Sequence, residues 1–166
     1  MRVVLATVVP LAAALLQGSV VPFIAVAGAR PNLVVLAAAS WGVAVGAREA
    51  VWWAFLGGLA ADLLSGGPLG AMAIAALVPV SALALTEGER ERSLITGAVL
   101  VGVASLVSGL LYLLILGLTG AGASEPAPLV AAAVGGGVYN GVLAIATYPL
   151  CRGLRRTTEK QASFGW

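Results

Sequence analysis

The sequence predicts an all-α membrane protein with six transmembrane helices and both termini in the cytoplasm. Of its 166 residues, 60% are hydrophobic and only 10% are charged, and the mean hydropathy is +1.04. Soluble domains carry about 25% charged residues. The apolar runs are continuous and do not alternate with polar residues, which favours helices over a β-barrel. Basic residues gather at alternate ends of these runs, and this pattern predicts the topology.

Charged residues and turn signals divide the chain into six apolar segments. A helix needs about 20 apolar residues to cross the hydrocarbon core of a bilayer. The sequence Ser65-Gly66-Gly67-Pro68 is a turn signal that splits the long segment 50–86 into two short spans. The expected helices cover about 3–26, 31–46, 50–65, 69–85, 94–118 and 128–151. They make one transmembrane domain over residues 1–151, followed by a basic and mobile cytoplasmic tail at 152–166.

The distribution of basic residues sets the expected orientation. Lys and Arg accumulate in short cytoplasmic loops. With six spans and both termini inside, only Arg30 lies on the outer side, whereas five or seven spans would scatter the basic residues over both faces. The cytoplasmic side then receives Arg2, Arg48, Arg90, Arg92, Arg152, Arg155, Arg156 and Lys160.

The N-terminal segment has a second interpretation. Arg2, the apolar run after it and Ala25-Val26-Ala27 are also typical of a cleavable signal peptide. The apolar region of a signal peptide is usually about 7–15 residues long, and the run here is longer. We therefore expect this segment to be retained as the first helix.

The residue inventory excludes several classes of chemistry. The chain has no histidine, one cysteine (Cys151) and one aspartate (Asp62). An intrachain disulfide, a Cys/His metal site and a Ser–His or Cys–His nucleophile therefore cannot form. An intramembrane aspartyl protease would need a second aspartate, and a net charge of +2 is too small to indicate nucleic-acid binding. We expect no enzyme activity, no catalytic residue, no cofactor and no metal.

Asp62 is the one charged residue within a long apolar stretch. Such a residue is costly at bilayer depth, so it usually points into the helix bundle and marks function. Counting 1.5 Å per residue from Arg48 places Asp62 about 20 Å above the cytoplasmic surface. We expect a polar cluster at this level with Gln17, Arg30 and Asn32, in which Arg30 is the counter-ion of Asp62. The cluster has two interpretations: a structural hydrogen bond or helix cap, and a site that binds a partner or a substrate.

Small residues at helical spacing predict close contacts between membrane helices. One motif surrounds Asp62, and a second face in segment 128–151 adds a polar residue, Asn140, that can hydrogen-bond across helices. Tight helix packing and a lined cavity are both compatible with these faces. The first motif consists of Gly57, Gly58, Gly66, Gly67, Pro68 and Gly70. The second consists of Gly137, Asn140 and Gly141.

Three motifs between residues 30 and 76 carry a family resemblance. Arg30-Pro31-Asn32-Leu33 opens a helix, and Trp41 and a Gly46-x-Arg48-Glu49 turn follow. The most specific stretch is Phe55-Leu56-Gly57-Gly58-Leu59-x-x-Asp62-Leu63-Leu64-Ser65-Gly66-Gly67-Pro68-Leu69-Gly70. In these motifs the chain resembles the rod shape-determining protein MreD family. Members of that family often have an acidic residue where this chain has Asn32, which weakens any model in which two carboxylates act together.

The resemblance implies a non-enzymatic membrane scaffold of the bacterial elongation (rod) complex in the cytoplasmic (inner) membrane. Such proteins bind MreC and help connect MreB filaments to RodA and its class B penicillin-binding partner, and so support cell shape and lateral peptidoglycan synthesis. The resemblance leaves a homodimer open, and the basic tail is expected to contact anionic lipid or a cytoplasmic partner.

The family is also similar in fold to the six-helix substrate-binding component of energy-coupling factor transporters. Fold alone does not transfer function. The alternative function is therefore an uptake component of that type, which would use the polar cluster as a ligand pocket and would need an ATPase partner.

Overall fold

The computed structural model describes residues 2–84, 92–122 and 125–163, and these residues form six α-helices, a short 3₁₀ helix and no strand. This confirms the expected all-helical class. The helices are α1 (Arg2–Ser19), α2 (Leu33–Ala44), α3 (Ala47–Ser65), α4 (Ala71–Ala84), α5 (Leu94–Leu118) and α6 (Pro126–Ser163), with η1 (Val21–Phe23) after α1.

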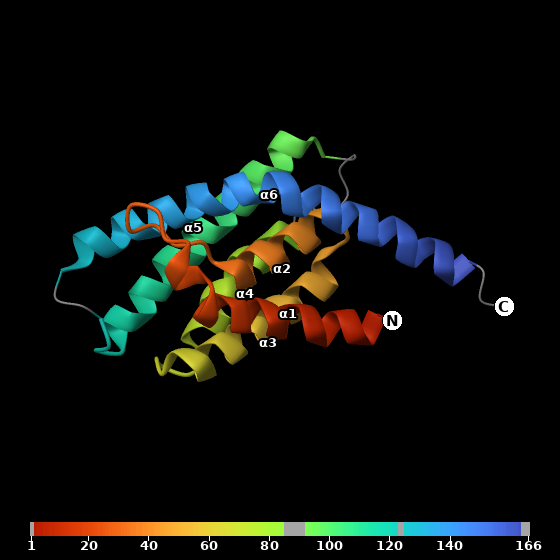
Figure 1. The fold of residues 1–166 in the computed structure, drawn as a ribbon. Helices are drawn as coiled ribbons and strands as arrows, with labels where there is room; N and C mark the ends of the chain where they lie inside the picture. The colour runs from red at the N-terminus through yellow and green to blue at the C-terminus, as the bar shows by residue number, and fades with distance from the viewer. Residues whose placement is uncertain (1, 85–91, 123–124, 164–166) are drawn as a thin grey trace.

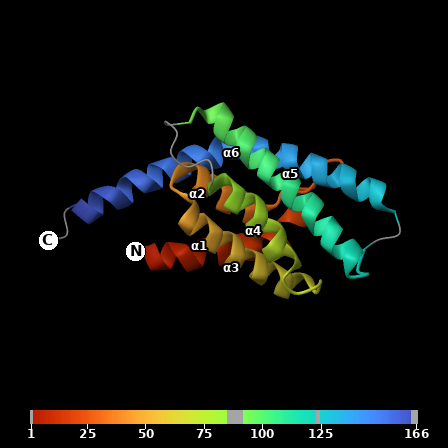
Figure 2. The ribbon, with the colours of Figure 1, turned by 180° about the vertical axis from the view of Figure 1, so that it is seen from behind.

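Helix α2 lies at the centre of the bundle and contacts each of the other five α-helices. Eight of its twelve residues are buried: Val34, Val35, Leu36, Ala38, Ala39, Ser40, Trp41 and Ala44. Both chain ends and the α2–α3 connection lie at one end of the bundle (Figures 1 and 2). The α1–α2 segment and the α3–α4 and α5–α6 turns lie at the opposite end. Consecutive helices therefore alternate in direction.

Two helix ends differ from the sequence prediction. The first helix ends at Ser19 instead of 26, because Pro22 has no N–H to continue the helical ladder. The chain then turns through Ala27 and Gly28, which both have positive φ. At the other terminus, the backbone of α6 remains helical to Ser163, so most of the expected mobile tail is an extension of the last helix. Residues 152–163 contain no proline and several good helix formers, which explains this continuation.

Helix length and composition allow two segments, Leu94–Leu118 and Ala127–Leu154, to cross a membrane. The apolar parts of α1, α2 and α4 are shorter: Val4–Ser19, Leu33–Ala44 and Ala71–Leu83. The 12 residues of α2 measure about 18 Å, against a hydrocarbon core of about 30 Å. Helix lengths therefore do not establish the six full spans that the sequence predicted.

The surface of the bundle is rich in large apolar side chains. Val8 on α1, Ile74 on α4, Val103 on α5 and Val142 on α6 are each more than half exposed. Apolar patches of this extent are unusual on soluble monomers and mark contact with a membrane or a partner. The surface is thus consistent with a membrane protein.

Candidate functional site

Asp62, on α3, caps the N-terminus of the neighbouring helix α4. Its side chain is 2% exposed. One carboxylate oxygen, Oδ2, accepts the backbone N–H groups of Gly70 (3.0 Å), Met72 (3.2 Å) and Ala73 (3.3 Å), and Oδ1 accepts that of Met72 at 2.9 Å. The first N–H groups of a helix have no partner within the helix and carry partial positive charge. The carboxylate satisfies three of these N–H groups and is stabilised by the helix dipole in return.

The local sequence explains why Asp62 reaches α4. Helix α3 ends at Ser65, the next residue, Gly66, turns the chain with a left-handed φ of 69°, and Gly70 has a φ of 90° just before α4 begins. One helical turn before Asp62, Gly58 lets the two backbones meet, since a Cβ there would lie 2.5 Å from the Cα of Ala73. Residues four apart share a helix face. The close contact at Gly58 therefore aims Asp62 at the start of α4.

Arg30 is not the partner of Asp62, contrary to the sequence-based expectation. Both residues lie in the described part of the chain, and no ion pair between them is found there. Arg30 is exposed, and its backbone carbonyl packs against Gly136 of α6. A helix N-terminus supplies hydrogen-bond donors and positive potential together. The first turn of α4 therefore replaces the expected arginine.

A second polar group, the Asn140 network, joins four helices around the N-terminus of α2. It consists of Gln17 (α1), Asn32 (the N-cap of α2), Ser105 (α5) and Asn140 (α6). The fully buried Asn140 donates from Nδ2 to the carbonyl of Asn32 and to Ser105 Oγ, both at 2.8 Å. Its Oδ1 accepts the N–H of Asn32 at 3.2 Å. Asn140 therefore uses both halves of its amide to hold α2 and α5.

The same network binds two further N–H groups in the first turn of α2. Gln17 accepts the N–H of Leu33 at 2.7 Å and donates to the carbonyl of Pro31 at 3.2 Å. The side chain of Asn32 accepts the N–H of Val35 at 3.1 Å. The side-chain nitrogen Nδ2 of Asn32 also lies 3.6 Å from the sulfur of Met72, whose backbone N–H donates to Asp62. The structure thus brings Gln17, Asn32 and Asn140 together and connects them to Asp62 through Met72.

The predicted small-residue face of α6 packs against α5. A Cβ on Gly137 would lie 2.9 Å from the Cβ of Leu106, and one on Gly102 would lie 3.1 Å from the carbonyl oxygen of Gly137. Gly141 lies in the same contact, where a Cβ would be 3.6 Å from the Cα of Gly102. This approach is what lets the short side chain of Asn140 reach α5.

Two members of these groups, Ser105 and Met72, were not among the predicted site residues. Ser105 lies three residues after Gly102, so its polar side chain shares the face that contacts α6. That spacing was a usable signal. Met72 donates its backbone N–H to Asp62. Because almost every residue type has a backbone N–H, the sequence gives no signal for this contact.

Trp41 and Glu49 join α2 to α3 at the other end of the bundle, and sequence reasoning did not assign them to a site. The indole N–H of Trp41 donates to Oε2 of Glu49 at 3.0 Å. The Trp41 ring stacks on that of Trp53 with centroids 4.6 Å apart, and both rings are 4% exposed. An aromatic pair of this kind adds about 0.5–1.5 kcal/mol beyond its buried area.

These contacts define what the polar residues can do. Asp62 and Asn140 direct their polar atoms at groups of the bundle itself, and the bonds fix the starts of α4 and α2. Within the described residues, no three His, Cys, Asp or Glu side chains lie close enough to hold a metal ion. The geometry therefore favours the structural interpretation of the polar cluster.

Asn140→Leu is expected to lower the stability of the protein. It would leave the N–H of Asn32 and the hydroxyl of Ser105 without their partner, and each buried unsatisfied group costs about 1–3 kcal/mol. The C=O of Asn32 would keep the N–H of Leu36. The melting temperature of the detergent-solubilised protein would measure the loss. Val142→Leu, at an exposed position of the same helix, is the matched control. Equal melting temperatures for the two variants would contradict a stabilising role of the network.

Comparison with known proteins identifies the family. No curated protein and no solved structure shows significant similarity to the chain. A family model for the rod shape-determining protein MreD, however, matches residues 1–157 of the 166. The match extends well beyond residues 30–76, and it does not favour the uptake-component alternative. The sequence-based assignment is confirmed: the chain belongs to the rod shape-determining protein MreD family.

Proposed function

We propose that this chain is a non-enzymatic membrane scaffold of the bacterial rod complex and that it binds MreC directly. The observation that carries the proposal is the family match over residues 1–157, which supports a role in rod shape determination. MreD is a structural, shape-determining family and not a known enzyme family. Through the complex, the scaffold would act with RodA, its class B penicillin-binding partner and MreB in lateral peptidoglycan synthesis.

The proposed location is the cytoplasmic (inner) membrane, crossed several times, with both termini in the cytoplasm. Family membership and the two long apolar helices are consistent with a membrane protein. The alternation of helix direction supports cytoplasmic termini, because both chain ends lie at the end of the bundle where α3 begins, and Arg48 is in the first turn of α3 (Figure 1). Arg30 lies in the segment at the opposite end. This separation agrees with the excess of basic residues in cytoplasmic loops.

The internal polar bonds support a scaffold in a further way. Asp62 and Asn140 fix the starts of α4 and α2, so their bonds hold these helices in set positions within the bundle. The exposed surface of these helices is apolar, as a partner helix in a membrane requires. A rigid binding surface loses less conformational entropy on association than a mobile one. The geometry thus suits recognition of protein partners in the bilayer.

Co-purification tests the proposal. The full chain, tagged and extracted from native membranes in mild detergent, is expected to recover MreC together with RodA or the penicillin-binding protein, as read by mass spectrometry. An unrelated multi-pass protein with the same tag is the control. Recovery of an ABC-type ATPase and a membrane coupling subunit in place of MreC would overturn the proposal.

A further inference from the structure

The helices of the bundle differ in length. The apolar part of α1, Val4–Ser19, is about 24 Å long and α2 is about 18 Å long, whereas α5 is about 37 Å long. The hydrocarbon core of a bilayer is about 30 Å thick. At the end of the bundle opposite the termini, α5 and α6 extend beyond the α1–α2 segment, residues 20–31 (Figures 1 and 2). The bundle therefore has a long side, formed by α5 and α6, and a short side at α1 and α2.

Contacts with α6 fix the level of the α1–α2 segment along the bundle. The hydroxyl of Tyr139 donates to the carbonyl of Ile24 at 3.1 Å. A Cβ on Gly135 would lie 2.6 Å from the Cβ of Ala29, so the segment packs directly on the backbone of α6. Gly135 is nine residues after Pro126, where α6 begins, which corresponds to about 13 Å along the helix. The segment is thus recessed by most of the thickness of one hydrocarbon leaflet, about 15 Å.

The exposed side chains of this recessed segment are complementary to a phospholipid. Phe23 is 88% exposed and Val26 is 61% exposed. Arg30 is exposed as well, and none of the described residues forms a hydrogen bond or an ion pair with its guanidinium. Guanidinium groups bind phosphate with two parallel hydrogen bonds, and apolar side chains beside it can contact acyl chains. Charge and apolar surface therefore lie together at the level where the short helices end.

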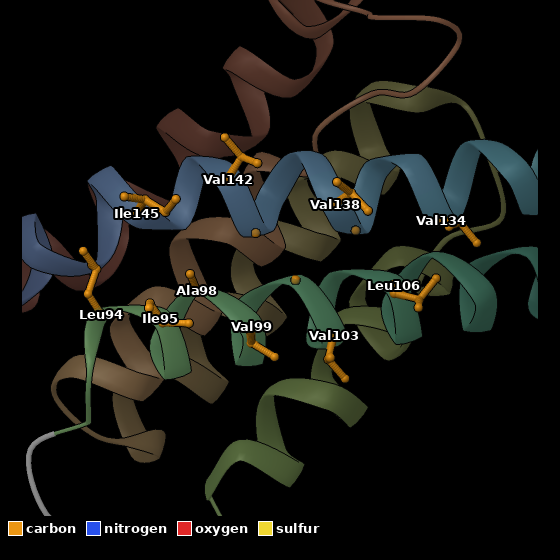
Figure 3. A pocket seen from close by; sticks show the side chains of 13 residues that line it. Leu94, Ile95, Ala98, Val99, Val103, Leu106, Val134, Val138, Val142 and Ile145 are labelled. Carbon is orange, nitrogen blue, oxygen red and sulfur yellow. The ribbon is translucent and has the colours of Figure 1, made fainter.

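The other face of α6 is apolar at the same level. Val134 and Val138 line a groove of about 480 Å³ beside α5, and all of the residues that line it are apolar or glycine (Figure 3). Val138 directly precedes Tyr139, so it lies at the level of Ile24. No charged side chain lines this groove, and nothing there would attract lipid headgroups toward the bilayer centre. The long side is therefore suited to hydrocarbon of full depth.

We propose that the protein thins the outer leaflet on its α1–α2 side, with a phospholipid phosphate bound to Arg30 and acyl chains against Phe23 and Val26. The proposal rests on the proposed membrane placement, in which this segment lies on the outer side. A bilayer adapts to a short apolar span by thinning. Immersion of the segment in lipid tails is disfavoured, because non-helical backbone is not stable in hydrocarbon. The scaffold would thus shape the bilayer beside it as well as bind proteins.

Phosphorus NMR of the lipid tests the proposal on the purified full chain in dioleoylphosphatidylcholine bilayers. A nitroxide is attached to Phe23→Cys or to Val138→Cys, each in a Cys151→Ala background. The label at position 23 is expected to enhance phosphate relaxation far more than the label at position 138, although both lie at one level. Arg30→Gln should remove most of this difference, because the phosphate loses its ligand. Arg48→Gln, at an exposed position of the other end of the bundle, is the matched control and should preserve the difference.

Equal enhancement by the two labels would overturn the proposal, because it is expected both for a leaflet of full thickness and for a recess filled by water alone. A difference that persists in Arg30→Gln would overturn the assignment of the phosphate to Arg30. Val26→Cys is a second label site on the segment and should behave as Phe23→Cys does. Melting temperatures in the same bilayers show whether each labelled protein is folded.

MreC recovery from native membranes, measured on the unlabelled wild type, separates this proposal from the scaffold function. A difference between the labels without MreC recovery would sink the scaffold function alone. MreC recovery with equal enhancement by the two labels would sink the thinned leaflet alone.

Discussion

Asp62→Ala is expected to destabilise the protein by about 2–4 kcal/mol and to abolish its support of rod shape. The change leaves the part-buried N–H groups of Gly70 and Met72 and the buried N–H of Ala73 without an acceptor. Loss of a helix N-cap costs about 0.5–2 kcal/mol, and a buried donor left unsatisfied costs about 1–3 kcal/mol. The melting temperature in detergent should fall by about 5 °C or more. Cell shape in a complementation assay, at matched protein level, gives the functional readout.

Two companion variants test the mechanism of this effect. Asp62→Asn keeps one carbonyl oxygen as an acceptor and should lose less stability than alanine. Arg30→Ala should leave the melting temperature unchanged, because Arg30 is exposed and makes no ion pair with Asp62 within the described residues. If Arg30→Ala were as damaging as Asp62→Ala, the arginine would be the counter-ion after all. Normal rods with Asp62→Ala would contradict the importance of the cap.

Gly58→Ala should be nearly as damaging, although it adds a single methyl group. The new Cβ would lie 2.5 Å from the Cα and 2.8 Å from the N of Ala73, so α3 and α4 would have to separate. Overpacking of this kind costs about 1–3 kcal/mol, and separation of the helices would also lengthen the bonds of Asp62. The same substitution at Gly18 is the matched control, since no atom beyond its chain neighbours and its own helix backbone lies within 4 Å of its Cβ position.

Thermal unfolding in detergent distinguishes these glycine variants. Gly18→Ala should unfold at or slightly above the temperature of the wild type, because alanine is about 0.5–1 kcal/mol better than glycine within a helix. Gly58→Ala should unfold well below it. Coincident curves for the two variants would mean that α3 and α4 do not approach as closely at Gly58 as the structure shows.

Sequence reasoning predicted the helical class and the family, but not where several helices end. Charge marks a helix boundary only where charged residues occur, and the segment from Val3 to Ala29 has none. The end of α1 at Ser19 therefore had to be read from Pro22 alone. The bounds of α2, by contrast, were predicted to within two residues at each end, because Arg30 precedes it and Arg48 follows it.

The sequence predicted the level of the polar residues along the bundle, but not the direction in which each helix points its side chains. Counting residues placed Gln17, Asn32 and Asp62 at one level, and the structure places all three near the starts of α2 and α4. The partner of Asp62 was missed because its donors are backbone amides of α4. Arg30 was the only basic side chain expected at that end, so pairing by charge pointed to the wrong group. A list of the charged side chains does not include the N-terminus of a helix, although its backbone N–H groups carry partial positive charge.

The short sequence distance between Asp62 and its donors has a consequence for biosynthesis. The N–H groups that bind the carboxylate follow it by only 8 to 11 residues. On the proposed topology, a nascent chain that has delivered α3 but not the start of α4 would expose a bare carboxylate to hydrocarbon, at a cost of several kcal/mol. Synthesis of a few further residues of the same chain supplies the N–H donors for this carboxylate. Release of α3 and α4 into the bilayer together, as one hairpin, avoids this cost, because the carboxylate of Asp62 is then already hydrogen-bonded to α4. This step needs no partner protein.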